Sequence, residues 1–68
     1  MPKMLRVLSS SLYSVGYEEN DLFIKFQSGI TYVYYEVTSD VYMALINASS
    51  KGRFLNQYIK GYYWYKKL

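Results

Sequence analysis

Apolar and polar residues alternate through most of the first half of the chain with the two-residue period of a β-strand. Segments 11–17, 22–26 and 30–37 carry this alternation and are rich in β-branched and aromatic residues, so each predicts a strand. The polar run 18–21 and the glycine-containing run 27–29 separate them, and such runs form tight turns. The pattern therefore predicts an antiparallel meander.

The same alternation predicts which side chains of the first two strands share a face. On the first strand these are Tyr13, Val15 and Tyr17. On the second strand they are Leu22, Ile24 and Phe26.

The hydrophobic period changes to that of a helix after residue 37. Residues 38–40 offer two hydroxyls for an N-cap and a carboxylate for the first turn. Apolar side chains then recur at helical spacing and predict a first helix near 40–48. These are Val41, Tyr42, Leu45 and Ile46.

A second capping signal, Ser49 and Ser50, predicts a second helix near 50–60 that ends before Gly61. At 100° per residue, its apolar side chains fall in one arc and its polar side chains on the opposite face. The apolar arc is Phe54, Leu55, Tyr58 and Ile59, and the polar face is Arg53, Asn56, Gln57 and Lys60. The aromatic run 62–65 predicts either a fourth strand or a tail packed back on the domain.

These elements predict one small α+β domain over residues 1–68, a three- or four-stranded antiparallel sheet packed against two short helices. The chain has no Cys and no His, which excludes disulfides, thiolate zinc sites and imidazole ligands. Its ten Tyr, three Phe and one Trp offer buried area in their place. No segment has the length of a signal-peptide core or a membrane span, so a soluble cytoplasmic protein is expected.

The charges are segregated along the chain. Residues 1–17 carry a net charge of +2, residues 18–40 carry −4, and residues from 41 onward carry +5 with no acid. Such asymmetry favours a polyanionic partner for the C-terminal part.

Candidate catalytic and metal-binding groups are few. Ser49, Ser50 and Lys51 resemble a serine–lysine pair, but helix capping explains them better, so no catalytic residue and no enzyme activity is expected. Ser49, Ser50 and Gly52 are a candidate anion site at the helix N-terminus. The acids of run 18–21 lack the spacing of a calcium loop, so neither a metal nor a cofactor is expected.

Tyr32 and Tyr34 lie on the predicted third strand, and their face depends on the hairpin before it. A two-residue loop at 28–29 turns both tyrosines away from the apolar face of the second strand, whereas a three-residue loop at 27–29 turns them toward it. The first arrangement makes a stacking platform for bases beside Lys25. The second is favoured, because a small core needs the buried area.

One ordered series of motifs runs along almost the whole chain: Ser9–Ser11, Gly16-Tyr17, Leu22, Ile24, Phe26, Gly29, Tyr32-Val-Tyr34, Val37, Tyr42, Leu45, residues 48–54, Asn56, Ile59-Lys60 and a late Tyr. This series resembles the KTSC domain, a short module also found at the C-terminus of some lysyl-tRNA synthetases. Thr38 departs from it, since a Pro is expected after the Val. The resemblance implies a stand-alone domain without catalytic residues and, through the synthetase context, RNA as a ligand.

The sequence therefore predicts a non-enzymatic module that binds single-stranded or tRNA-like RNA through cations and exposed aromatic rings. The candidate residues are Lys25, Tyr32, Tyr34, Lys51, Arg53, Lys60, Trp64, Lys66 and Lys67. The alternative is an interaction module in which segment 62–65 contacts a protein partner or a second copy of the chain. Neither hypothesis involves a membrane.

Overall fold

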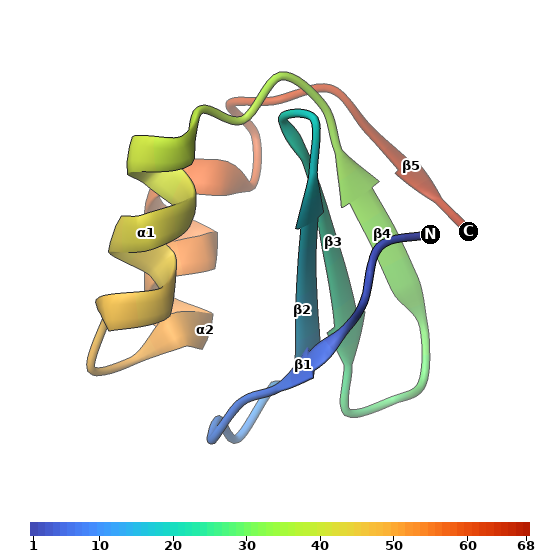
Figure 1. Cartoon of the computed structure of the whole chain (residues 1–68). Coiled ribbons are helices and arrows are strands. Elements are labelled where there is room, and N and C mark those ends of the chain that lie inside the picture. The colour runs from blue at the N-terminus through green and yellow to red at the C-terminus, as the bar shows by residue number, and fades with distance from the viewer.

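A computed structural model describes all 68 residues as a five-stranded antiparallel sheet with helices on one face (Figure 1). The strands are β1 (Leu5–Arg6), β2 (Leu12–Glu18), β3 (Asp21–Phe26), β4 (Thr31–Tyr34) and β5 (Tyr65–Lys67), in the order β1-β2-β3-β4-β5. The helices are α1 (Ser39–Asn47), α2 (Lys51–Phe54) and the π-helical turn η1 (Leu55–Ile59). The predicted α+β class is confirmed, but the sheet has five strands rather than the predicted three or four.

The two extra strands are the edges of the sheet. β1 has only two residues, too few for a recognisable alternation. β5 lies at 65–67 rather than 62–65, and it is a strand because it pairs with β4, with Tyr65 opposite Tyr34 and Lys67 opposite Tyr32. Its sequence, Tyr-Lys-Lys, does not by itself favour a strand.

The hairpin between β3 and β4 has the three-residue loop. Phe26 donates its amide to the carbonyl oxygen of Ile30 at 2.9 Å, and Gly29 takes the left-handed φ of +93° that the turn requires. Leu22 then pairs with Tyr34, and Ile24 with Tyr32. The favoured prediction is confirmed, because both tyrosines share the face of the apolar core.

The first strand departs from simple alternation. The register between β2 and β3 shifts between Leu12 and Ser14, so Tyr13 is the extra residue of a β-bulge. The predicted shared face of Tyr13, Val15 and Tyr17 is therefore wrong for Tyr13. Leu12 takes its place in the core, and the Tyr13 ring lies against cations on the other face.

The second helix begins as predicted, with the amide of Arg53 donating to Ser50 Oγ at 3.4 Å. It then widens into η1, where Lys60 donates its amide to the carbonyl oxygen of Leu55 five residues earlier. The wider turn keeps Leu55 and Ile59 buried but leaves Tyr58 58% exposed, which corrects its predicted place in the apolar arc. Lys60 is already extended, with ψ of 125°, so it does not continue an α-helical line from Arg53.

The core lies between the helices and the inner face of the sheet. Nine buried residues form it: Leu12, Val15, Leu22, Ile24, Tyr34, Val37, Leu45, Leu55 and Ile59. The Tyr17 ring stacks on Tyr42 of α1 with centroids 4.4 Å apart, and its hydroxyl donates to the carbonyl oxygen of Val37 at 2.5 Å. Tyr17 therefore fixes the start of α1 against the sheet.

The outer face of the sheet is partly covered by the first residues of the chain. A Cβ added at Gly16 would lie 2.6 Å from Met4 Sδ and 3.2 Å from the carbonyl oxygen of Lys3. Gly16 is therefore the position that lets this segment approach the sheet so closely. None of the helices has the length and apolar character needed to cross a bilayer.

Candidate functional site

A pocket of about 310 Å³ opens beside strands β4 and β5, and we call it the tyrosine pocket. It is lined by Tyr32, Tyr34, Lys60, Gly61 and Tyr65. Tyr34 is 1% exposed, Tyr32 is half-buried and Tyr65 is 59% exposed. The Tyr65 ring centroid lies 5.6 Å from that of Tyr32 and 5.9 Å from that of Tyr34. The buried Tyr34 ring therefore forms the inner side of the pocket, and the accessible Tyr65 ring lies on its solvent side.

Strand pairing brings these residues together. Residues directly opposite in an antiparallel pair share a face, so Tyr65 lies beside Tyr34, and Lys67 lies on the face of Tyr32. Lys60 and Gly61 follow η1, and the φ of +85° at Gly61 confirms its predicted left-handed position after the helix. Lys60 and Lys67 therefore lie on the side of the tyrosines, and no carboxylate lines the pocket.

The most deeply buried ring stays protonated at neutral pH. Burial, with smaller contributions from Tyr32 and Tyr65, raises the pKa of Tyr34 to about 12. Tyr34 therefore adds a neutral phenol to the pocket, while positive charge comes from lysine.

This pKa gives a testable pH dependence. The folded value of about 12 lies above the value of about 10 for an unfolded tyrosine, so the stability linked to this proton is complete below pH 10 and is lost as the pH rises toward 12. Tyr34→Phe should remove a decline of at most about 1.4 kcal/mol per pH unit in that window. Denaturation at pH 9 to 12 measures it, with Tyr62→Phe as the exposed control. Equal pH dependence in Tyr34→Phe and wild type would contradict the assignment.

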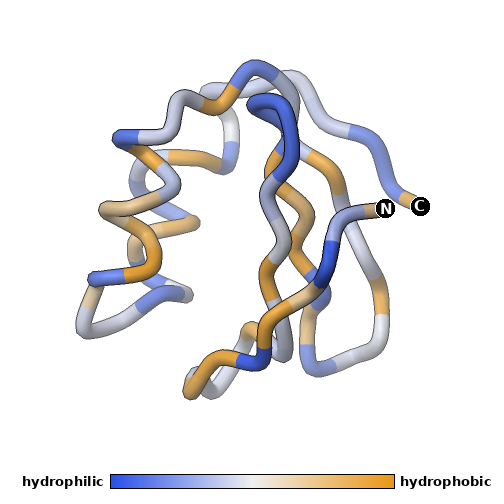
Figure 2. Tube along the Cα trace, viewed as in Figure 1, coloured by the Kyte–Doolittle hydropathy of each residue, from blue (hydrophilic) through white to orange (hydrophobic).

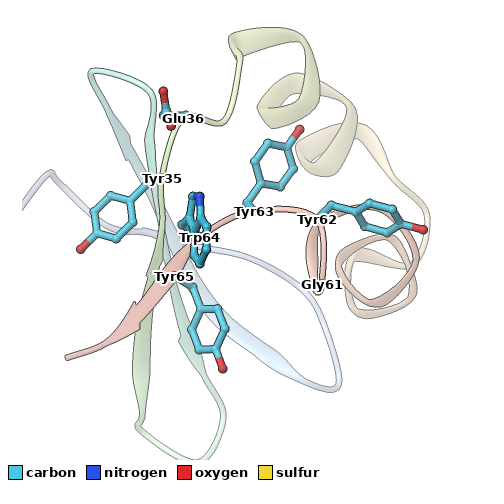
Figure 3. Close-up of a pocket in the computed structure, with 7 residues that line it drawn as sticks. All are labelled: Tyr35, Glu36, Gly61, Tyr62, Tyr63, Trp64 and Tyr65. Atoms are coloured by element: carbon cyan, nitrogen blue, oxygen red, sulfur yellow. The ribbon is translucent and has the colours of Figure 1, made fainter.

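A larger depression of about 510 Å³ surrounds Trp64 (Figure 3). Its lining includes Tyr35, Glu36 and residues 61–65, and the labelled side chains point in different directions rather than toward a common centre. Trp64 is 81% exposed, and its carbonyl oxygen accepts from the Tyr35 amide at 2.9 Å. The Glu36 carboxylate makes this depression a poor place for a phosphate.

The acids of the chain gather toward one end of the domain. Glu18, Glu19 and Asp21 lie at the β2–β3 turn, the thick blue loop just below the link from β4 to α1 in Figure 2. The link from β4 to α1 carries Glu36 and Asp40, and the Val37 amide ties it to the turn by donating to the carbonyl oxygen of Asn20 at 2.8 Å. This end disfavours a polyanion, whereas the tyrosine pocket has lysines beside it.

The other predicted site residues are spread over the surface. Lys66 pairs with Val33 and therefore lies on the face opposite Lys67. Lys25 is also on the outer face, with its Nζ 5.2 Å from the Tyr13 ring centroid. The nine candidates for nucleic-acid binding thus do not form one surface.

The predicted anion site at the second helix has a packing role. Lys51 Nζ donates to the carbonyl oxygen of Ala48 at 3.2 Å, and Ser50 caps the helix. A Cβ on Gly52 would collide with the Ser11 hydroxyl, so Gly52 permits a close contact with the residue that precedes β2. Arg53 and Ser49 are exposed.

The sequence did not assign an individual binding role to Tyr65, Arg6 or Tyr13. Tyr65 stood within an aromatic run, but its place beside Tyr32 depends on the pairing of β4 with β5. The position of the Tyr13 ring on the outer face depends on the β-bulge, and the position of Arg6 beside it depends on the pairing of the two-residue strand β1 with β2. Each requires contacts between segments that are distant in the sequence or locally irregular.

Comparison with known proteins matches the whole fold. A family model, the KTSC domain, matches residues 8–63. A protein of Tsukamurella paurometabola is 42% identical over 84% of this chain and 88% of its own length, and an uncharacterised protein of Stutzerimonas stutzeri is 43% identical over 85% and 84%. The crystal structure of a KTSC domain protein from Yersinia pestis superposes with a TM-score of 0.90 at 36% identity, covering 97% of this chain and 96% of that one. With its Tyr-x-Tyr strand at 32–34 inside the matched region, the chain belongs to the KTSC domain family.

Proposed function

We propose that this protein is a non-enzymatic module that binds single-stranded RNA at the tyrosine pocket and the adjoining edge strand β5. The observation that carries the proposal is the accessible Tyr65 ring, which lies beside Tyr32 with Lys60 and Lys67 on the same side of the sheet. Base stacking on aromatic rings together with cations along the phosphates is how single-stranded nucleic acids are held without strict sequence preference.

The shape of the pocket favours unpaired bases. Tyr34 is buried and Tyr32 is half-buried, so the open rings are Tyr65 and the exposed part of Tyr32, and only a base that has left its stack can lie against them. Lys60 and Lys67 then meet the phosphates beside that base. A double helix has its bases stacked inside and would offer the pocket only its backbone.

The alternative partner, a second copy of the chain, is less well supported. β5 is an edge strand with free backbone groups, which could pair with another strand. However, Lys66 and Lys67 occupy two of its three positions, and lysines on an edge strand oppose pairing between copies. The same lysines attract phosphate, so the edge strand is better suited to binding RNA than to pairing with the β5 strand of a second copy.

Substitution of Tyr65 tests the proposal. Tyr65→Leu should weaken binding of an unstructured RNA oligonucleotide about tenfold, since stacking contributes about 1–3 kcal/mol per base, and should leave the salt dependence unchanged. Tyr62→Leu is the matched control, because Tyr62 is also exposed but lies outside the tyrosine pocket. Fluorescence polarisation measures both affinities. Equal losses in the two variants, or none in Tyr65→Leu, would contradict the proposed site.

A further inference from the structure

A second group of cations lies on the outer face of the sheet, away from the tyrosine pocket. Four residues are direct partners across four successive strands: Arg6 with Ser14, Ser14 with Lys25, and Lys25 with Thr31. Neighbouring strands are about 4.8 Å apart, so the backbone positions of Arg6 and Lys25 lie about 10 Å apart on one face. A pocket of about 370 Å³ opens along this row, lined by Met1, Met4, Arg6, Tyr13, Ser14, Lys25 and Thr31.

The β-bulge supplies the aromatic wall of this outer pocket. As the extra residue, Tyr13 turns its ring to the same face as Arg6 and Lys25. Arg6 Cζ lies 3.9 Å from the ring centroid, and Lys25 Nζ lies 5.2 Å from it. Arg6 also donates from Nη1 to the Tyr13 hydroxyl at 3.3 Å. One ring thus holds two positive charges close to each other.

The remaining polar lining consists of hydroxyl groups. Ser14 is 3% exposed, and its hydroxyl takes part in none of the side-chain hydrogen bonds of the protein. Because no fully buried side-chain oxygen or nitrogen lacks a partner, this hydroxyl is open to the pocket. Thr31 adds a second hydroxyl, and no carboxylate lines the pocket. The pocket therefore combines a guanidinium, an ammonium and hydroxyl donors without an internal counter-charge.

We propose that the outer pocket binds a phosphate group, either free or esterified. Arginine offers a planar fork of donors that matches phosphate oxygens, and lysine adds a point charge. A bound phosphate would also offset the repulsion between Arg6 and Lys25. The pocket and the tyrosine pocket lie on opposite faces of the sheet, so this inference does not depend on RNA binding at the tyrosine pocket.

Titration with inorganic phosphate tests the proposal on the whole chain. At constant ionic strength near neutral pH, amide NMR signals of Ser14, Lys25 and Thr31 should shift and saturate, whereas chloride should not shift them. Arg6→Gln should raise the dissociation constant at least tenfold, and Lys25→Gln gives the same test if Arg6→Gln fails to fold. Arg53→Gln, which removes an exposed cation elsewhere, should change it less than twofold. Shifts that do not saturate, or equal effects of Arg53→Gln and Arg6→Gln, would overturn the proposal.

A second arm separates the two sources of phosphate. If Arg6→Gln weakens binding of an RNA oligonucleotide by the same factor as binding of inorganic phosphate, the site holds a phosphate of the RNA backbone. If it weakens only phosphate binding, the ligand is free phosphate or a small phosphate ester. Both results support the pocket as a phosphate site, whereas retention of full phosphate affinity in Arg6→Gln and in Lys25→Gln would rule it out.

Discussion

Leu55→Ala and Ile59→Ala are each expected to lower the free energy of unfolding by about 2–5 kcal/mol. Both side chains are buried in the core, and both lie on the π-helical turn η1. Truncation leaves a cavity that a domain of 68 residues has little other core to compensate for. Urea denaturation measures the loss, and these variants should be largely unfolded at moderate temperature.

Tyr58→Ala is the matched comparison on the same turn. Its side chain is 58% exposed, so the free energy of unfolding is expected to change by no more than about 0.5 kcal/mol. The ring contact that is lost is with Phe54, whose ring centroid lies 4.9 Å from that of Tyr58. Phe54 is half-buried, so Phe54→Ala should cost less than the 3–5 kcal/mol of a fully buried Phe. A loss at Tyr58 as large as that at Ile59 would restore the uniform α-helical projection and contradict the π-helical turn.

Reversing Lys60 and Lys67 together, as Lys60→Glu with Lys67→Glu, should lower affinity for single-stranded RNA at least about 100-fold at about 50 mM salt. Both cations lie on the side of the tyrosine pocket, so the change removes two phosphate contacts and puts two negative charges in their place. The slope of log affinity against log salt should flatten by about 1.4, at 0.7 per neutralised phosphate. Fluorescence polarisation over a series of salt concentrations gives both values.

The control carries the same change in net charge at another place. Lys51 and Arg53 belong to α2, which lies away from β5 in Figure 1. Lys51→Glu with Arg53→Glu should therefore reduce affinity only a few-fold, through the long-range field. If the two double variants lose affinity equally, binding depends on net charge alone and the tyrosine pocket is not the site.

Much of the fold followed from local patterns. The strands near 11–17, 22–26 and 30–37 were predicted from alternation, and the helix starts from capping residues. Both signals act over a few neighbouring residues. The predicted side-chain cap is present at Ser50, whereas Thr38, the N-cap of α1, makes no side-chain capping hydrogen bond. Local patterns left two hairpin registers open, and the register that buries Tyr34 was favoured because a small core requires the buried area of aromatic rings. The burial of Tyr34 confirms this register.

The features that the sequence did not reveal depend on tertiary contacts. β5 is a strand through pairing with β4, and this pairing brings Tyr65 and Lys67 to the tyrosine pocket. The π-helical turn moves Tyr58 outward and separates Lys60 from Arg53. A projection at a uniform 100° per residue cannot represent a π turn. Arg53 and Lys60, which were predicted to share one face of the second helix, therefore do not lie on a common helical face.

The salt dependence of RNA binding by the wild-type protein tests the central claim most directly. Counting all five cations between residues 51 and 67 gives a slope of about −3.5, at 0.7 per neutralised phosphate, but only Lys60 and Lys67 lie on the side of the tyrosine pocket, since Lys66 is on the opposite face of the sheet. The structure therefore predicts measurable affinity for an unstructured RNA oligonucleotide at about 50 mM salt and a slope near −1.4. No detectable binding at that salt concentration, where phosphate contacts are strongest, would contradict the proposed function.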